Sequence, residues 1–170
     1  LFTHRGLSGP AILQISSYWQ PGQPLVIDLL PHLDIAEALQ EAKASSKKQL
    51  PNLLAQWLPT RLAEAWCQHT PAWQGPVNQC SDKALAQLAH SLSHWQITPS
   101  GTEGYAKAEV TLGGVDTQAL AQQSMQAKQQ PGLFFIGEVV DITGWLGGYN
   151  FQWAWASAYA CAQALQAASA

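Results

Sequence analysis

The residue types best suited to chemistry gather in one stretch, GEVVDITGWLGGYN (137–150). A continuous apolar run, GLFFIGEVV, leads into it, and an Ala-rich apolar segment follows it. If a helix begins at its end, the amides of Gly148, Tyr149 and Asn150 lack intrahelical acceptors and carry about half a positive charge together. Such donors suit a phosphate or the anionic edge of a ring, and Glu138 could accept hydrogen bonds from hydroxyl groups. The stretch therefore predicts a ligand site beyond the end of a buried strand.

The same glycines allow a second interpretation that involves no ligand. Glycine lacks the Cβ atom that would collide in a tight turn between a strand and a helix, and Asn150 is a favourable N-cap residue. A single glycine-rich turn is also a weak signal of function. The residues alone therefore leave both a ligand site and a purely structural turn open.

A second group of polar residues stands near the start of the chain, in THRGLSGPAIL. His4 or Arg5 could act on a substrate, as a proton donor or as an anchor for an anion. Thr3 and Ser8 could instead make turn and cap contacts, with His4 as a hydrogen-bonded structural residue. Pro10 suits the first turn of a helix, whose cap would be Ser8 or the glycine after it. This cap pattern favours the structural interpretation.

The elements that would position these residues follow from hydrophobic patterns and turn residues. GLFFIGEVV is apolar without interruption, as in a strand of a parallel sheet that is covered on both faces. Between residues 31 and 93, apolar positions recur at helical spacing and predict four short helices, with Asp34 and either Ser81 or Asp82 as helix starts and Pro59 as a divider. The predicted strands are 23–31, 94–101, 105–112 and 132–140, and the other predicted helices begin near Ser8 and span 150–167.

The composition argues against two classes of partner. The 170 residues are 47% hydrophobic and 11% charged, far below the usual fraction of about a quarter for charged residues. A net charge of −3 gives no electrostatic reason for nucleic-acid binding, and no apolar run approaches the roughly 20 residues of a membrane span. We therefore expect no nucleic acid and no membrane among the partners. Eight Trp on a chain with few charges indicate a surface that further chain, a subunit or a cofactor covers.

The three cysteines are odd in number and widely spaced, which favours a reducing compartment, the cytoplasm, over a disulfide framework. A zinc site is an alternative, and it would recruit Cys67, His69, Cys80, His90 and His94. The spacing of these residues fits no regular zinc pattern. We expect buried thiols, histidines on helix surfaces, and no metal.

Three motifs, in this order, resemble a known bacterial family: THRGLSGPAIL (3–13), AEVTLGGVDT (108–117) and PGLFFIGEVVDITGWLGGYNFQWAWASAYA (131–160). They are similar to the C-terminal flavin-binding segment of BaiN/YhiN-type (aminoacetone-oxidase-like) FAD-dependent oxidoreductases, and more distantly to fumarate reductase flavoproteins. The helical block lies where that family has an inserted domain. The resemblance spans nearly the whole chain, and the third motif is the longest and most specific.

The resemblance implies that ten residues lie at or near FAD. A glycine and an acid at the end of the last strand would lie beside its ribityl and pyrophosphate portion, and the glycine-rich turn would face the pyrimidine edge of the isoalloxazine. An earlier Gly-Gly turn would pass near the ring as a wall of the substrate side. Amides and a helix dipole at the pyrimidine edge would stabilise negative charge at N1 and O2 of reduced flavin. In chain order these residues are Gly113, Gly114, Gly137, Glu138, Asp141, Gly144, Gly147, Gly148, Tyr149 and Asn150.

The fold that the resemblance implies is an α/β or α+β fragment, the C-terminal part of a two-dinucleotide-binding-fold flavoprotein with an inserted helical domain. Residues 1–30 would end an inserted β or substrate domain, 31–93 would form the helical insertion, and 94–170 would belong to the FAD-binding domain. The sequence contains no G-x-G-x-x-G after a strand, a motif that the family carries in its N-terminal part. We therefore expect a missing N-terminal part of the same protein as partner, and weak FAD binding or none by this chain alone.

The implied function is hydride transfer between flavin N5 and a small organic substrate, with NAD(P)H as a further candidate for co-substrate. The named residues would position and tune the ring, while the redox chemistry belongs to the cofactor. One alternative comes from a different class: a non-enzymatic module that binds a partner protein through residues 31–93 and has a structural glycine turn. A strand–GxGxxG–helix upstream in the gene would favour the flavoprotein.

Overall fold

The computed structural model describes residues 1–168, which fold into two compact units. Gly22–Ser100 form a helical unit, and Leu1–Pro21 join the chain from Gly101 onward in a second unit. The described residues contain six α-helices and two small antiparallel sheets. This mixture confirms the predicted combination of helices and strands.

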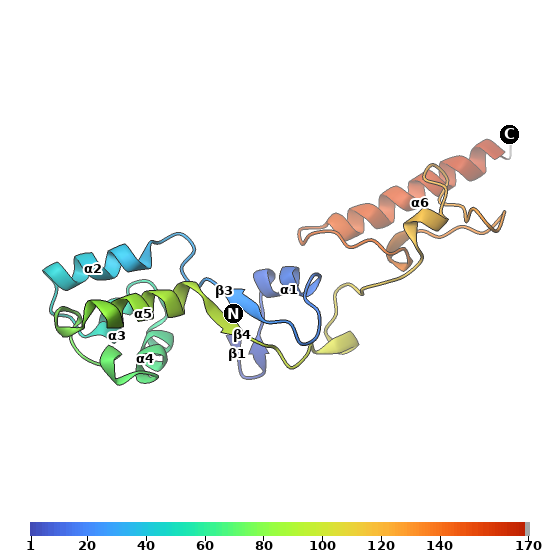
Figure 1. Ribbon diagram of the computed structural model, residues 1–170. Coiled ribbons are helices and arrows are strands. Elements are labelled where there is room, and N and C mark those ends of the chain that lie inside the picture. The colour runs from blue at the N-terminus through green and yellow to red at the C-terminus, as the bar shows by residue number, and fades with distance from the viewer. Residues whose placement is uncertain (169–170) are drawn as a thin grey trace. The chain divides into compact units, whose positions relative to one another are not determined.

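A short pair of antiparallel strands joins the first and last segments of the helical unit. Its first strand, Leu25–Ile27, pairs antiparallel with its last, Trp95–Ile97, so both ends of the segment belong to the same unit. The unit is therefore wider than the predicted helical insertion of 31–93. Figure 1 shows its helices gathered around one another. The elements are β3 (Leu25–Ile27), α2 (Ile35–Ser45), α3 (Leu50–Leu54), α4 (Thr60–Gln68), η1 (Pro71–Trp73), η2 (Val77–Gln79), α5 (Asp82–Ser93) and β4 (Trp95–Ile97).

Side-chain caps start the two longest helices of this unit, as the sequence predicts. Asp34 Oδ1 accepts a hydrogen bond from the amide of Glu37 at 3.0 Å, and Ser81 Oγ accepts one from the amide of Ala84 at 3.1 Å. Each cap satisfies an amide that has no partner inside its helix. Of the two candidates for the start of α5, Ser81 is the cap.

The core of the helical unit consists of leucines that the helical spacing places on inward faces. Leu39, Leu54 and Leu88 come from α2, α3 and α5 and are 0% exposed. Trp73 is buried among these helices, and its indole nitrogen donates to the carbonyl of Ala84 at 3.0 Å. A polar atom of a large core side chain is thus satisfied, which fixes the 3₁₀ turn η1 against α5.

The free thiol of Cys67 gives this core a dependence on pH. Burial, followed by the nearby Cys80 thiol, raises the pKa of Cys67 to about 11. An unfolded thiol ionises near its usual pKa of about 8.5, so the free energy of unfolding should fall as pH rises from about 8.5 to about 11. Urea unfolding across this range measures the fall. Cys67→Ala should flatten the dependence, whereas Cys161→Ala, in the other unit, should leave it unchanged; equal dependence in all three proteins would contradict the assignment.

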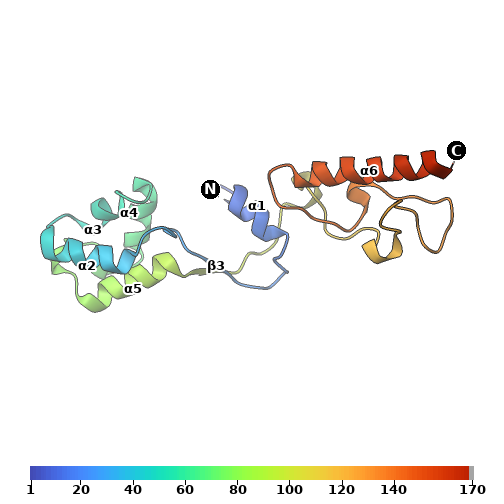
Figure 2. The same cartoon turned by 90° about the horizontal axis from the view of Figure 1, so that it is seen from above.

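The second unit consists mostly of turns around one long helix. Its helix α1 (Pro10–Ser16) has proline in its first turn as predicted, and the cap residue is Gly9, with φ of 96°, rather than Ser8. Helix α6 (Tyr149–Ala168) confirms the predicted apolar helix, and Figure 2 shows it along its length. The other elements are β1 (Phe2–Thr3), β2 (Gly6–Leu7), η3 (Gly104–Ala106), η4 (Thr117–Ala119) and η5 (Gly137–Val139).

Two of the predicted strands are wrong. Residues 105–112 contain the end of η3 followed by turns, and residues 132–140 contain the 3₁₀ turn η5 in place of a buried parallel strand. A strand needs a ladder of hydrogen bonds to a neighbour. Here the apolar run makes only isolated bridges, from Phe134 to Gln126 and from Val140 to Val115. Glu138 therefore lies on a 3₁₀ turn and not at the end of a strand.

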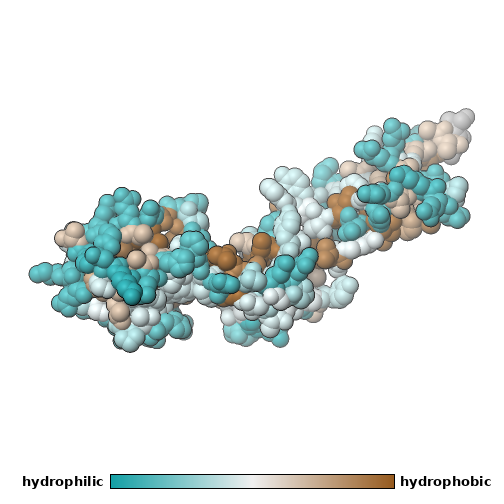
Figure 3. Space-filling view, viewed as in Figure 1, coloured by the Kyte–Doolittle hydropathy of each residue, from teal (hydrophilic) through white to brown (hydrophobic). Residues whose placement is uncertain are grey.

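Helix α6 leaves a row of aromatic side chains uncovered in the part of the chain that the structure describes. Phe151, Trp155 and Tyr159 follow one another at intervals of four residues, and are 71%, 75% and 68% exposed. Figure 3 shows a predominantly hydrophilic surface on the helical unit and apolar patches on the unit that contains α6. Within residues 1–168, no helix combines the length and the hydropathy needed to cross a membrane.

Candidate functional site

The Gly113–Gly114 turn lies directly against the segment that contains η5. The amide of Val115 donates to the carbonyl of Val139 at 2.8 Å, and the amide of Asp141 donates to the carbonyl of Val115 at 2.9 Å. A Cβ atom on Gly114 would stand 2.4 Å from Val139 O, so only glycine permits this approach. Two segments that are more than twenty residues apart in the sequence are therefore hydrogen-bonded side by side.

Helix α6 holds Gly137, the first residue of η5, through both of its backbone polar groups. Its amide donates to Ser157 Oγ at 2.9 Å, and its carbonyl accepts from the indole nitrogen of Trp153 at 3.0 Å. Gly137 has φ of 71°, which favours glycine. Glu138 follows it and is exposed. The Glu138 carboxylate therefore lies on a turn whose first residue, Gly137, is hydrogen-bonded to α6.

Asn150 fastens the loop before α6. Its Oδ1 accepts from the amide of Gly144 at 2.7 Å, and its Nδ2 donates to the carbonyl of Gly144 at 3.4 Å. A Cβ atom on Gly144 would stand 2.8 Å from Tyr149 Cβ. Asn150 lies inside α6, which begins at Tyr149, so the alternative that makes it the N-cap is wrong.

The loop between Gly144 and α6 is also attached to α1. The amide of Leu146 donates to Gln14 Oε1 at 3.0 Å, and the indole nitrogen of Trp145 donates to the hydroxyl of Tyr18 at 3.3 Å. These contacts join the segment that directly follows the first sequence motif to the third motif, inside the same unit. They also give the helix after Pro10 a function that cap chemistry alone does not suggest.

The turn at Gly147 and Gly148 combines exposed backbone with unused hydrogen-bond donors. Both glycines are exposed, with φ of 111° and 97°, and no atom lies within 4 Å of a Cβ built on Gly148. Within residues 1–168, the amides of Gly147, Gly148 and Tyr149 donate to no acceptor. Unused donors at the start of a 20-residue helix, beside backbone with no side chain, could donate hydrogen bonds to an anionic or electron-rich ligand.

Replacing Asn150 by Ala should loosen this loop. The amide of Gly144 would lose its acceptor, which costs about 1–3 kcal/mol for a group shielded from water. Hydrogen exchange at Gly144 measures the change and should accelerate. Asn150→Asp retains an acceptor but loses the donor to the Gly144 carbonyl, so an intermediate rate is expected; equal exchange in all three proteins would show that the side chain does not hold the loop.

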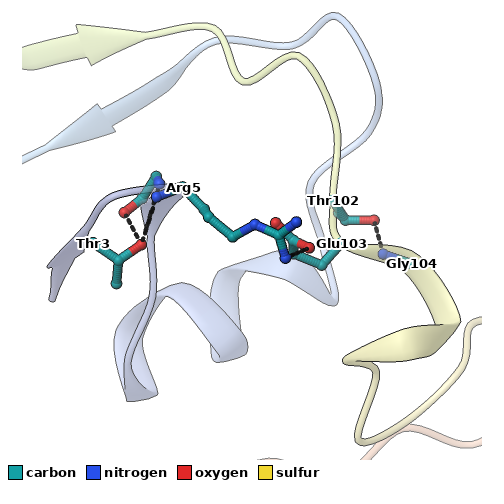
Figure 4. A network of polar contacts seen from close by, with 6 residues as sticks. Thr3, Arg5, Thr102, Glu103 and Gly104 are labelled. Atoms are coloured by element: carbon teal, nitrogen blue, oxygen red, sulfur yellow. Dashed lines mark hydrogen bonds and ion pairs between the residues drawn. The ribbon is translucent and has the colours of Figure 1, made fainter.

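The residues near the N-terminus form a hairpin turn, drawn in Figure 4. Thr3 Oγ1 accepts from the amides of Arg5 and Gly6 at 3.2 Å each, which confirms the turn role suggested for Thr3. Arg5 pairs with Glu103 at 3.0 Å, and both side chains are largely exposed. His4 is exposed on the same turn. The contacts of Arg5 are those of a surface ion pair, and catalysis by His4 or Arg5 stays a prediction.

Within residues 1–168, the side chains proposed for a zinc site do not come together. Cys67 and Cys80 are buried, while His90 and His94 stack on each other near the end of α5 with ring centroids 4.6 Å apart. Throughout residues 1–168, no three His, Cys, Asp or Glu side chains lie close enough to share a metal ion. The expectation of a protein without metal stays a prediction.

Sequence reasoning missed Ser157, which is 1% exposed and accepts the hydrogen bond from Gly137. Its Oγ also donates toward the carbonyl of Trp153 at 2.8 Å. The available signal was a small polar residue in the Ala-rich apolar helix. Trp153 is half-buried and also holds Gly137, because its indole nitrogen donates to the carbonyl of that residue.

Curated relatives show what this chain is similar to. It is 53% identical over 163 residues to a ribosomal RNA dihydrouridine synthase of Haemophilus influenzae and 55% identical over 169 residues to one of Escherichia coli. It is 26% identical over 174 residues to a 3-dehydro-bile acid delta(4,6)-reductase of Clostridium scindens. These matches cover 95%, 99% and 95% of the chain, but only 41%, 42% and 42% of the respective relatives.

A family match covers more than half of the chain. Residues 1–110 match the family described as "HI0933-like protein barrel and H2TH domain". The family is a flavoprotein-like oxidoreductase family, and this match supports the predicted redox role. The distant reductase relative supports the same role. On this match, the chain belongs to the HI0933-like family.

Proposed function

We propose that this chain is the part of an FAD-dependent oxidoreductase that holds one side of the flavin. The observation that carries the proposal is the cluster of unused amides at Gly147, Gly148 and Tyr149, at the start of α6. Bound FAD would supply hydride transfer at its N5 atom, with NAD(P)H as the hydride donor. Family membership and the reductase relative support this redox role.

The chain's own residues would bind and orient the ring. The amides of Gly148 and Tyr149, at the positive end of the α6 dipole, would donate to the pyrimidine edge and favour the reduced, anionic form. The exposed Glu138 carboxylate would accept hydrogen bonds from ribityl hydroxyls. Asn150 and Ser157 would hold the loop in place through Gly144 and Gly137.

We propose uridine in ribosomal RNA as the substrate. Two relatives at 53% and 55% identity carry the name ribosomal RNA dihydrouridine synthase, and the match covers almost all of this chain. In uracil, C6 is β to the C4 carbonyl, so hydride adds at C6 and a proton adds at C5 while NAD(P)H is oxidised. This substrate opposes the expectation of no nucleic-acid partner, which rests on net charge alone and stays untested.

The proposed enzyme needs more chain than these 170 residues. The chain spans about two fifths of the length of the curated relatives that it matches. We propose that an N-terminal part of the same polypeptide covers the aromatic row Phe151, Trp155 and Tyr159, because that face is apolar and uncovered. This chain alone should then be colourless, and stoichiometric FAD on it would contradict the proposal.

The test uses full-length protein from the complete gene. It should be yellow, NAD(P)H should bleach it without oxygen, and a ribosomal RNA transcript should restore the colour and gain dihydrouridine, as mass spectrometry measures. Glu138→Ala combined with Asn150→Ala should strip or weaken the flavin. Glu109→Ala, which removes an exposed carboxylate elsewhere in the same unit, is the matched control. An unchanged flavin affinity in the double variant would overturn the assignment of the site.

A further inference from the structure

The end of α2 and the turn between α2 and α3 concentrate positive charge on the helical unit. Three of the chain's eight Lys and Arg residues fall within six positions, at Lys43, Lys47 and Lys48. Lys43 Nζ forms an ion pair with Asp82 Oδ1 at 2.6 Å. Lys47 and Lys48 are exposed, and neither forms an ion pair with a carboxylate in residues 1–168. Two cations are therefore available to a partner.

The backbone that carries these lysines is fixed. The carbonyl of Lys48 accepts from the amide of Val77 at 2.9 Å, and the amide of Leu50 donates to the carbonyl of Gly75 at 3.0 Å. Ser46 Oγ accepts from the amide of Lys48 at 3.1 Å. The turn is thus bonded to the loop before α5 as well as internally, so little order must be gained when it binds.

A groove of about 300 Å³ opens beside the turn. Its walls include Ser46, the side chain of Lys48 and the half-buried indole of Trp57. Ser45 also lines the groove, but its hydroxyl donates to the carbonyl of Glu41 at 2.8 Å. Hydroxyl and ammonium groups donate to phosphate oxygens, and an indole offers a flat apolar surface to a ribose or a base. Glu41 also lines the groove and would repel phosphate at its own end.

We propose that this turn and groove dock the phosphate backbone of the RNA substrate. The inference rests on the proposed function, and the choice of RNA over other partners rests on charge: the two ammonium groups of Lys47 and Lys48, which pair with no carboxylate in residues 1–168, and the hydroxyl of Ser46 complement phosphates. Contacts of this kind position a substrate without reading its sequence. They also reconcile a net charge of −3 with an RNA partner, because the local charge differs from the average.

The test measures binding of a ribosomal RNA transcript to full-length, flavin-loaded protein at several salt concentrations. Lys47→Ala combined with Lys48→Ala should weaken binding about tenfold at moderate salt and lower the slope of log affinity against log salt by roughly 1 to 2. Arg61→Ala combined with Lys107→Ala removes the same charge from exposed positions elsewhere and should change neither value. Glu41→Gln should tighten binding.

The outcomes separate this inference from the proposed function. Dihydrouridine formed by wild-type protein, together with unchanged affinity and salt slope in the lysine variant, would overturn the docking site alone. Weakened binding in that variant, together with no dihydrouridine from wild-type protein, would overturn the substrate and leave the docking site standing. If poly-glutamate binds at these lysines and the RNA transcript does not, the groove serves an acidic polypeptide and the inference is wrong.

Discussion

Replacing Gly114 by Ala in the full-length protein should weaken flavin binding roughly 5- to 150-fold. The new Cβ atom would lie 2.4 Å from Val139 O and 3.1 Å from Asp141 N, and both are backbone atoms that cannot swing aside. The turn must move away, which breaks the hydrogen bonds of Val115 with Val139 and Asp141. Two backbone hydrogen bonds contribute about 0.5–1.5 kcal/mol each, which gives this range. Recovery of flavin fluorescence on release measures the affinity.

Gly113→Ala is the matched control for that variant. Gly113 also has positive φ, 87°, but nothing lies within 4 Å of the Cβ atom that it would gain. It carries only the strain of a left-handed alanine, about 1–2 kcal/mol, with no collision. The affinity should fall less than in Gly114→Ala. If both variants lose flavin equally, close approach of the two segments is not what shapes the site.

Replacing Leu88 by Ala should lower the free energy of unfolding of the helical unit by about 2–5 kcal/mol. Leu88 is 0% exposed in the middle of α5, which packs against α2. Loss of three carbon atoms leaves a cavity that the surrounding leucines fill only in part. Urea unfolding measures the loss, and amide exchange along α5 shows whether it falls on this helix.

Gln87→Ala changes the neighbouring exposed position on the same helix and controls for helix propensity. Its effect should stay within about 0.5 kcal/mol, as for most surface substitutions. A loss comparable to that of Leu88→Ala would mean that α5 is stabilised by something other than its buried face.

The helices were predictable because their determinants are local. Asp34 and Ser81 cap helices within three residues of themselves, and the spacing of the leucines assigns a buried face to each helix. The glycine-rich turn before α6 was predictable for the same reason. Gly147 and Gly148 in this turn have positive φ angles that other residues rarely adopt.

The strand at 132–140 was not predictable in the same way. The sequence of an apolar run does not show whether the run forms a ladder of hydrogen bonds or only isolated bridges. That outcome depends on pairing partners that are distant in sequence. The same limit explains Ser157 and Gln14, whose roles come from hydrogen bonds to Gly137 and Leu146 that no local pattern encodes.

The fastening of Gly137 to α6 has a consequence for biosynthesis. Its partners Trp153 and Ser157 lie 16 and 20 residues further along the chain, so a ribosome exposes the glycine first. At roughly 5–20 residues per second, the nascent loop waits for about a second or more before its anchor emerges. Premature termination before Ser157 would remove the acceptor of the Gly137 amide, and we expect the released polypeptide to be cut by proteases at this loop.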